Sequence, residues 1–226
     1  MQRKIRIAPG EYYHIYNRGN RRQNIFKDER DWIRLLFIFL NFQSPLNFFN
    51  IGRYVSHFVK HRVFNTQNQI STIIENRFVS LSAFALMPNH FHILIREERE
   101  NGIIQYMQRS LNAYSKYFNT KYEQSGHLFQ GPYKIVHVKD NEQLLYLSAY
   151  IHRNPCGLKK WNNKEHVYPW SSYQDYTSKN RWDNLLERDI ILEQFSSISE
   201  YGNFMETSGA KILNNTDQET LIDDED

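Results

Sequence analysis

The 226-residue sequence contains a single cysteine, Cys156, so no disulfide can form within the chain. No hydrophobic run is long enough to cross a membrane, and residues 1–9 are too short, basic and polar for a secretory signal. Internal repeats and the zinc-protease motif His-Glu-x-x-His are also missing. These absences favour a cytoplasmic globular protein that uses neither disulfides nor a familiar structural zinc site.

The charge is unevenly distributed along the chain. Residues 207–226 include six acidic residues and one lysine, a net charge of −5, which predicts a solvated, disordered tail. The preceding 206 residues therefore carry 27 basic and 19 acidic side chains, a net charge of +8. Such an excess favours contacts with phosphates, so we expect a nucleic-acid partner, a nucleoid-associated location and no membrane partner.

The pattern of apolar residues predicts the order of secondary structure. Strands are expected near 11–17, 77–87, 91–97 and 132–138, and helices near 29–42, 46–62, 102–122, 141–153 and 188–205. This order predicts an α+β fold in which helices pack on an antiparallel sheet. We expect a main domain at 1–176, a helical extension at 177–206 and the acidic tail at 207–226.

Two histidines mark the start of one predicted strand, where His90 and His92 flank Phe91. Side chains alternate between the faces of a strand, so the two imidazoles point to the same side. Neutral imidazole is a common metal ligand, and the pair can supply two ligands of a divalent-cation site while leaving positions open for substrate. A third ligand must then come from elsewhere. Partly exposed strand histidines without a metal are the alternative interpretation.

A second motif begins with a capping box, in which Asp140 precedes Gln143 by three residues. Pro155 is expected to stop the helix, because its ring disfavours α geometry at Asn154. Tyr150 and Asn154 are four residues apart, so they lie on one helix face, where a phenol and a carboxamide oxygen can converge on a metal-bound phosphate. Simple packing of the tyrosine at the edge of the core is the alternative.

Resemblance to a known family rests first on the segments Leu86-Met-Pro-Asn-His90-Phe-His92 and Tyr150-Ile-His-Arg-Asn154-Pro155. They resemble the single-tyrosine HUH transposases, in particular the REP-associated tyrosine transposase branch of the IS200-like superfamily. The resemblance covers roughly residues 10–176. It also includes Tyr13-His-Ile-Tyr-Asn-Arg-Gly-Asn-Arg-Arg22, Gly126-His-Leu-Phe-Gln-Gly-Pro-Tyr-Lys134 and Tyr168-Pro-Trp-Ser-Ser-Tyr173.

The resemblance implies that Tyr150 attacks a DNA phosphodiester, takes the 5′ phosphate and releases a 3′ hydroxyl. It implies that His90, His92 and Asn154 hold Mg²⁺ or Mn²⁺, with asparagine standing where better-known relatives have glutamine. The implied fold is a ferredoxin-like (RRM-like) palm of the HUH endonuclease type, with the histidines on a central strand and the tyrosine helix laid across it. The implied substrate is single-stranded or hairpin DNA, which is nicked and rejoined.

Basic, amide and aromatic side chains interleave in several segments, a combination expected where single-stranded or hairpin DNA binds. After the first strand, Gly19 permits a tight turn that would present polar side chains to phosphates or base edges. The residues predicted to contact DNA are Arg18, Asn20, Arg21, Arg22, Arg53, Lys60, Arg62, Arg109 and Lys134. Ordinary solvated loops and helix faces are the alternative for each segment.

Three functions stay open at this level. The favoured one is a metal-dependent single-strand endonuclease and transposase. The second is a hairpin DNA- or RNA-binding regulator that uses the same scaffold without cleavage. The third is a zinc hydrolase with a solvent nucleophile, which would leave Tyr150 without a role. No periodic seam determines the oligomeric state, so a monomer and a homodimer both stay open.

Overall fold

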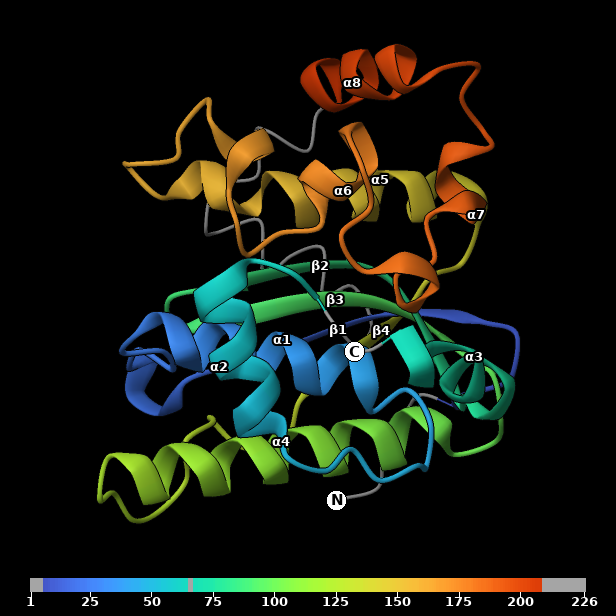
Figure 1. The fold of residues 1–226 in the computed structure, drawn as a ribbon. Helices are drawn as coiled ribbons and strands as arrows, with labels where there is room; N and C mark the ends of the chain where they lie inside the picture. The colour runs from blue at the N-terminus through green and yellow to red at the C-terminus, as the bar shows by residue number, and fades with distance from the viewer. Residues whose placement is uncertain (1–5, 65–66, 209–226) are drawn as a thin grey trace.

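The computed structural model describes residues 6–64 and 67–208, which are built around a four-stranded antiparallel sheet (Figure 1). The strands are β1 (Tyr12–Arg18), β2 (Val79–Met87), β3 (His90–Glu97) and β4 (Lys134–His137). Their order across the sheet is β2-β3-β1-β4. With helices between the strands, this topology confirms the predicted α+β fold and its ferredoxin-like palm.

Strands β2 and β3 are almost completely buried because helices cover the sheet on both sides (Figure 1). Every residue of β2 is buried, and only the first residue and one near the end of β3 are partly exposed. The two strands join through the predicted two-residue turn at Pro88 and Asn89. In the resulting register His90 lies opposite Met87, and His92 lies opposite Ala85.

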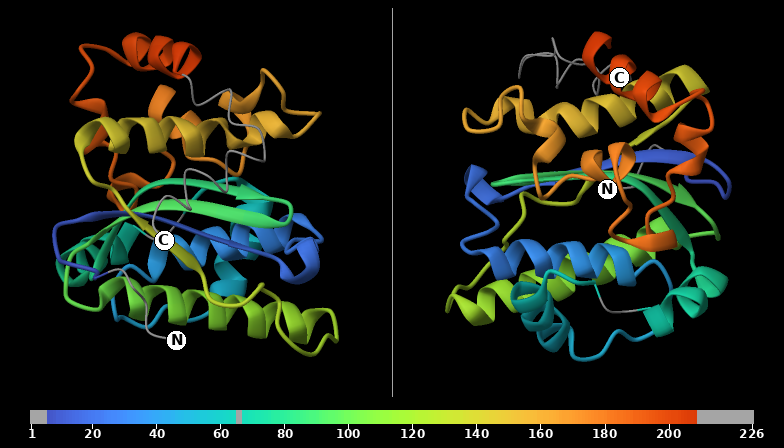
Figure 2. Two further views of the ribbon diagram at one scale, coloured as in Figure 1. Left: turned by 180° about the vertical axis from the view of Figure 1, so that it is seen from behind. Right: turned by 45° about the horizontal axis from the view of Figure 1, so that its top comes forward.

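One face of the sheet is covered by α1 (Glu29–Asn41) and α4 (Gly102–Lys121), and α2 (Ile51–His61) packs on α1 (Figure 2). Phe39 of α1 meets Phe91 of β3 edge-to-face, with ring centroids 5.1 Å apart. At the start of α4, the Glu97 carboxylate accepts hydrogen bonds from two backbone N–H groups of the first turn. Phe91 therefore anchors the core on this face, which leaves its two histidine neighbours for the other.

The other face is covered by α5 (Asn141–Arg153), whose bounds agree with the prediction. The Asp140 side chain accepts a hydrogen bond from the Gln143 backbone N–H at 2.7 Å, which confirms the helix start. At the other end, we predicted that Pro155 would force Asn154 out of α geometry. This prediction is wrong, because Asn154 keeps right-handed helical geometry (φ −50°, ψ −39°). Pro155 ends the α-helix by lacking an N–H donor, and the chain continues as a short 3₁₀ turn, Asn154–Gly157.

Other element boundaries differ from the predictions. Helix α2 begins at Ile51 instead of near residue 46, and the single C-terminal helix expected at 188–205 is two helices, α7 (Asp189–Leu192) and α8 (Ile198–Thr207). Ser197 caps α8 by accepting a hydrogen bond from the Glu200 N–H, and this cap explains the break. Elements that the sequence did not predict are α3 (Gln67–Asn76), α6 (Tyr173–Thr177) and 3₁₀ turns at Asn20–Arg22 (η1), Glu165–Val167 (η3) and Asp183–Leu185 (η4).

The C-terminal extension packs against α5. His152 of α5 lies with Nδ1 2.7 Å from the Tyr201 hydroxyl of α8 and with Nε2 2.7 Å from the Ser172 hydroxyl. Tyr201 and Met205 belong to the same apolar core as the sheet. Most of the predicted acidic tail lies outside the described residues. Among the helices of the described segments, none is both long and apolar enough to span a membrane.

Candidate active site

The strand register gathers polar residues on the face of the sheet that α5 covers. Arg18 of β1 lies opposite His90 of β3, and Tyr16 of β1 lies between His92 on one side and Lys134 of β4 on the other. Directly opposed residues of antiparallel strands point to the same face. The two histidines, two of the predicted DNA-binding cations and an aromatic ring therefore share one surface.

Tyr150 lies over this surface in the same chain. Its ring centroid is 5.5 Å from that of His92, and the two rings are perpendicular. The side chain is 8% exposed, and its hydroxyl meets no hydrogen-bond partner of ordinary geometry among the described residues. Burial raises the pKa of Tyr150 to about 12, against an opposing effect of the Asn154 carboxamide and the Arg18 cation.

His90 lies between two carboxamides. Its Nδ1 is 2.7 Å from Oδ1 of Asn89, and its Nε2 is 3.2 Å from Oδ1 of Asn154. Burial lowers the pKa of His90 to about 4, so at neutral pH the ring carries one N–H and can donate to only one of the two oxygens. The other contact then joins two acceptors, an arrangement that a shared cation would stabilise. His90 Nε2 and Asn154 Oδ1 are close enough together for one divalent ion to bind both.

His92 has one ring nitrogen without a partner among the described residues. This atom, Nε2, is buried, while Nδ1 lies 2.9 Å from Nε2 of His14. No group of three or more His, Cys, Asp or Glu side chains suited to a metal ion occurs in the described part of the chain. A third protein ligand would therefore be of another residue type, and the Asn154 carboxamide oxygen lies 3.2 Å from His90 Nε2. The donor set of two imidazoles and one carboxamide oxygen fits a divalent ion that keeps water or substrate in its other positions.

Arg18 is the cation that acts on this site. Burial is the main cause of the lowered pKa values of His90 and His92, and the positive charge of Arg18 lowers both further. Arg18 is half-buried and its backbone N–H donates to the Asn17 side chain at 2.8 Å. The guanidinium thus lies near both predicted metal ligands and the tyrosine, where an anionic phosphate would compensate its charge.

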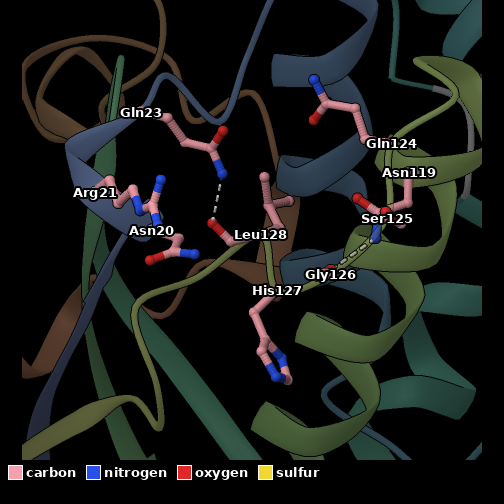
Figure 3. Close-up of a pocket in the computed structure, with 9 residues that line it drawn as sticks. All are labelled: Asn20, Arg21, Gln23, Asn119, Gln124, Ser125, Gly126, His127 and Leu128. Atoms are coloured by element: carbon pink, nitrogen blue, oxygen red, sulfur yellow. Dashed lines mark hydrogen bonds between the residues drawn. The ribbon is translucent and has the colours of Figure 1, made fainter.

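A surface pocket of about 470 Å³ adjoins the end of β1 (Figure 3). It is lined by Asn20, Arg21, Gln23, Asn119, Gln124, Ser125, Gly126, His127 and Leu128. The lining offers many hydrogen-bond donors and acceptors and no carboxylate, which suits a nucleic-acid partner. The Gly19 backbone N–H donates to the Asn89 carbonyl at 2.7 Å, so the pocket begins next to the turn that carries His90.

The turn that forms one wall of this pocket is tightly built. A Cβ on Gly19 would lie 2.2 Å from the Gln23 carbonyl oxygen, so no larger residue fits there. Arg21 and Arg22 both adopt left-handed backbone geometry, with φ of 52° and 61°. The Gln23 side chain donates to the Leu128 carbonyl at 3.2 Å and ties the turn to the opposite wall (Figure 3).

The remaining predicted DNA-binding residues are not brought to this surface. Arg53, Lys60 and the C-cap Arg62 belong to α2, on the other side of the sheet from α5 (Figure 1). Arg62 pairs with Glu29 at 2.6 Å, and Arg109 donates to the carbonyl oxygens of Ser44 and Leu46 at 2.6 and 2.9 Å. The guanidinium of Arg109 is thus used in holding the loop after α1.

Sequence reasoning missed three residues of the site. Asn89 contacts His90, His14 contacts His92, and the Tyr16 ring stacks on His92 with centroids 5.7 Å apart. His14 and Tyr16 have the same two-residue spacing as the histidine pair, and that spacing was the available signal. Their partners depend on strand pairing, which the local pattern does not specify.

Buried neutral histidines should make the fold sensitive to acid. Burial lowers the pKa values of His14 and His152 to about 3, below their ordinary 6.5. As the pH falls through 6.5, the unfolded chain therefore takes up protons first, and stability is lost progressively down to about pH 3. Each of the two histidines should lower the free energy of unfolding by about 2 kcal/mol at pH 5 relative to pH 7.

Urea unfolding at pH 7 and pH 5 measures this loss. The wild type should lose about 4 kcal/mol or more of unfolding free energy, and His152→Gln, which does not titrate, should lose about 2 kcal/mol less. Equal losses in the two proteins would contradict the assignment of His152 as a buried neutral residue.

Comparison with known proteins finds a family whose sequence model matches this chain. Residues 52–154 match the sequence model of a family described as "Transposase IS200 like". This span contains all four residues predicted to form the catalytic and metal site. The match confirms the predicted resemblance to IS200-like transposases.

A solved structure of a REP-associated tyrosine transposase bound to a REP hairpin has a similar fold. Its TM-score is 0.52 and its sequence identity is 12%, over 84% of this chain and 93% of that chain. At this identity the likeness concerns the fold. Comparison with curated proteins gives no match.

Proposed function

From the IS200-like match and the site geometry, we propose that this chain is a metal-dependent single-strand DNA endonuclease and transposase that cleaves hairpin-forming DNA ends with Tyr150. The observation that carries the proposal is a pair of unsatisfied groups. Among the described residues, His92 Nε2 is buried without a partner and the Tyr150 hydroxyl meets none of ordinary hydrogen-bond geometry, and the centroids of the two rings are 5.5 Å apart. Buried polar atoms are rarely left unpaired unless a ligand or a reaction uses them.

Three residues form the candidate ion site. Mg²⁺ or Mn²⁺ held by His90, His92 and Asn154 would polarise a non-bridging oxygen of the scissile phosphate. Arg18 places a further positive charge beside the same phosphate, where negative charge grows during the reaction. The half-buried position of this surface under α5 excludes part of the bulk water and strengthens these interactions.

Tyr150 performs the covalent step. Its Oη forms a bond to phosphorus while the bond from phosphorus to the 3′ oxygen breaks. The phenol proton passes to solvent, and the 3′ oxygen takes up a proton and leaves as a hydroxyl. The resulting 5′-phosphotyrosine keeps one phosphodiester bond, so attack by another 3′ hydroxyl reverses the step and joins strands.

The Tyr150 phenol is a weaker acid than an ordinary tyrosine before substrate binds, because burial raises its pKa to about 12. Cations gathered around the scissile phosphate favour the phenolate. The nucleophile is therefore activated only in the complete complex.

The DNA strand has a polar route away from the nucleophile. On the sheet face that α5 covers, Lys134 lies opposite Tyr16, and Arg18 lies two residues further along β1. The pocket lined by Asn20 and Arg21 adjoins the end of this strand. Amides and arginine pair with base edges, and the lysine and arginines contact phosphates. The similar structure bound to a hairpin supports hairpin DNA as the partner.

A denaturing gel tests the proposal. Purified protein is incubated with labelled hairpin oligonucleotides taken from the sequence flanking its own gene, with Mn²⁺ or with EDTA. We expect a covalent protein–DNA band with Mn²⁺ and at least ~100-fold less of it with EDTA, because the charge of the cation is needed at the phosphate. Hairpin binding without cleavage would favour a regulator, and cleavage without an adduct would favour a hydrolase with a solvent nucleophile.

A further inference from the structure

His14 and His92 form a buried pair on neighbouring strands. They are 2% and 4% exposed, and Nε2 of His14 lies 2.9 Å from Nδ1 of His92. The rings are nearly parallel, with an angle of 16° between their planes and 5.1 Å between centroids. In the β1–β3 register Tyr16, not His14, lies opposite His92, so His14 is its diagonal neighbour on the same face.

One hydrogen bond between two imidazoles can run in either direction. If His92 accepts at Nδ1, its own proton is on Nε2, which is then a buried donor without a partner in the part of the chain that the structure describes. If His92 donates from Nδ1, a lone pair is left on Nε2 and can bind an ion. The direction of this bond therefore decides whether His92 can be a ligand.

Metal-binding histidines commonly donate their second ring N–H to a carboxylate, a carbonyl or a water, which fixes tautomer and orientation. The other predicted ligand, His90, has such an acceptor in the Asn89 side-chain oxygen at 2.7 Å. At the corresponding atom of His92, the contact that the structure gives is Nε2 of His14.

We propose that His14 is a positioning residue whose Nε2 accepts the Nδ1–H of His92 and so holds the Nε2 lone pair of His92 toward the divalent ion. This inference rests on the proposed function, because it requires His92 to be a metal ligand. His14 itself does not bind the ion, since its Nε2 is occupied by the hydrogen bond. A buried imidazole thus accepts the hydrogen bond that a carboxylate or carbonyl accepts at many metal sites.

Mn²⁺ binding to the DNA-free protein tests the proposal without using activity. Phenylalanine fills the space of the ring but offers no acceptor, so His14→Phe should weaken Mn²⁺ binding about 10- to 100-fold, as measured by titration calorimetry or electron paramagnetic resonance. The Gln side chain can place an oxygen near the position of Nε2, so His14→Gln should stay within about 3-fold of wild type.

His137→Phe is the matched control, because His137 lies on β4 beside Tyr13, on the opposite face of the sheet. It should bind Mn²⁺ as the wild type does. Thermal unfolding in EDTA shows whether each variant is folded. A folded His14→Phe protein with wild-type Mn²⁺ affinity would overturn the proposal and show that His14 is a packing residue.

If His14→Phe does not fold, the wild type still decides the question. Nitrogen-15 NMR of the Mg²⁺-loaded protein should show His14 protonated at Nδ1 and bare at Nε2, and protonation at Nε2 would refute the proposal. Failure of the proposed function looks different. In that case wild-type protein would not bind Mn²⁺, or His92→Ala would bind it equally well, and the ligand set would fail together with the role of His14.

Discussion

Tyr150→Phe is expected to abolish the covalent adduct and to lower the cleavage rate by at least ~10⁴-fold, since it removes the nucleophile itself. The same change should not harm the fold. Within the described part of the chain the Tyr150 hydroxyl has no hydrogen-bond partner of ordinary geometry, so its removal relieves the desolvation cost of a buried polar group. We expect the free energy of unfolding to rise by about 1 kcal/mol, which corresponds to a gain of about 2–4 °C in Tm.

This combination of lost activity and gained stability is the informative result. A group kept for catalysis is often a poor choice for stability, and Tyr150 fits that description. Tyr146, one helical turn earlier on α5, is the matched control, and Tyr146→Phe should still form the adduct. An adduct that survives Tyr150→Phe but not Tyr146→Phe would identify Tyr146 as the nucleophile. Cleavage without any adduct would instead point to solvent.

The second large effect is expected at Arg18. Arg18→Ala should lower the cleavage rate about 10²- to 10³-fold at saturating hairpin, with hairpin affinity reduced less than about 10-fold. We expect this effect because Arg18 lies opposite His90 and its charge acts on both histidines and on Tyr150. A charge so placed stabilises the transition state more than the bound ground state.

Single-turnover cleavage and filter binding separate the two contributions. Arg18→Lys should recover part of the rate, because lysine keeps the charge but loses the planar pair of donors. Arg53→Ala on α2 is the matched control and should leave the single-turnover rate unchanged, since α2 lies on the other side of the sheet. If Arg18→Ala weakened binding 100-fold and cleaved normally at saturation, Arg18 would be an ordinary backbone contact.

Local patterns were sufficient for the main parts of the site. The alternation of a strand places His90 and His92 on one face, and helical spacing does the same for Tyr150 and Asn154. Both inferences depend only on near neighbours in the sequence. The cap at Asp140 is equally local, which explains why the bounds of α5 agree with the prediction.

Where local signals were weak, the predictions were incomplete. Helix α3 was missed because its sequence is mostly polar, with buried Ile70 and Ile73 as its contacts to the core. The C-terminal helix was predicted as one piece because its apolar residues continue across a break that the Ser197 cap creates. The Ser197 cap therefore starts a new helix, although the spacing of apolar residues would allow one continuous helix.

The sequence by itself determined the fold class, the two paired motifs and the helix that carries Tyr150. Only the tertiary structure decided which other residues join them. Strand register placed Arg18, Lys134 and His14 beside the site. Helix packing placed the basic residues of α2 on the other side of the sheet, and Arg109 holds the loop after α1. Register and layer order arise from contacts between distant segments, so no window of local sequence contains them.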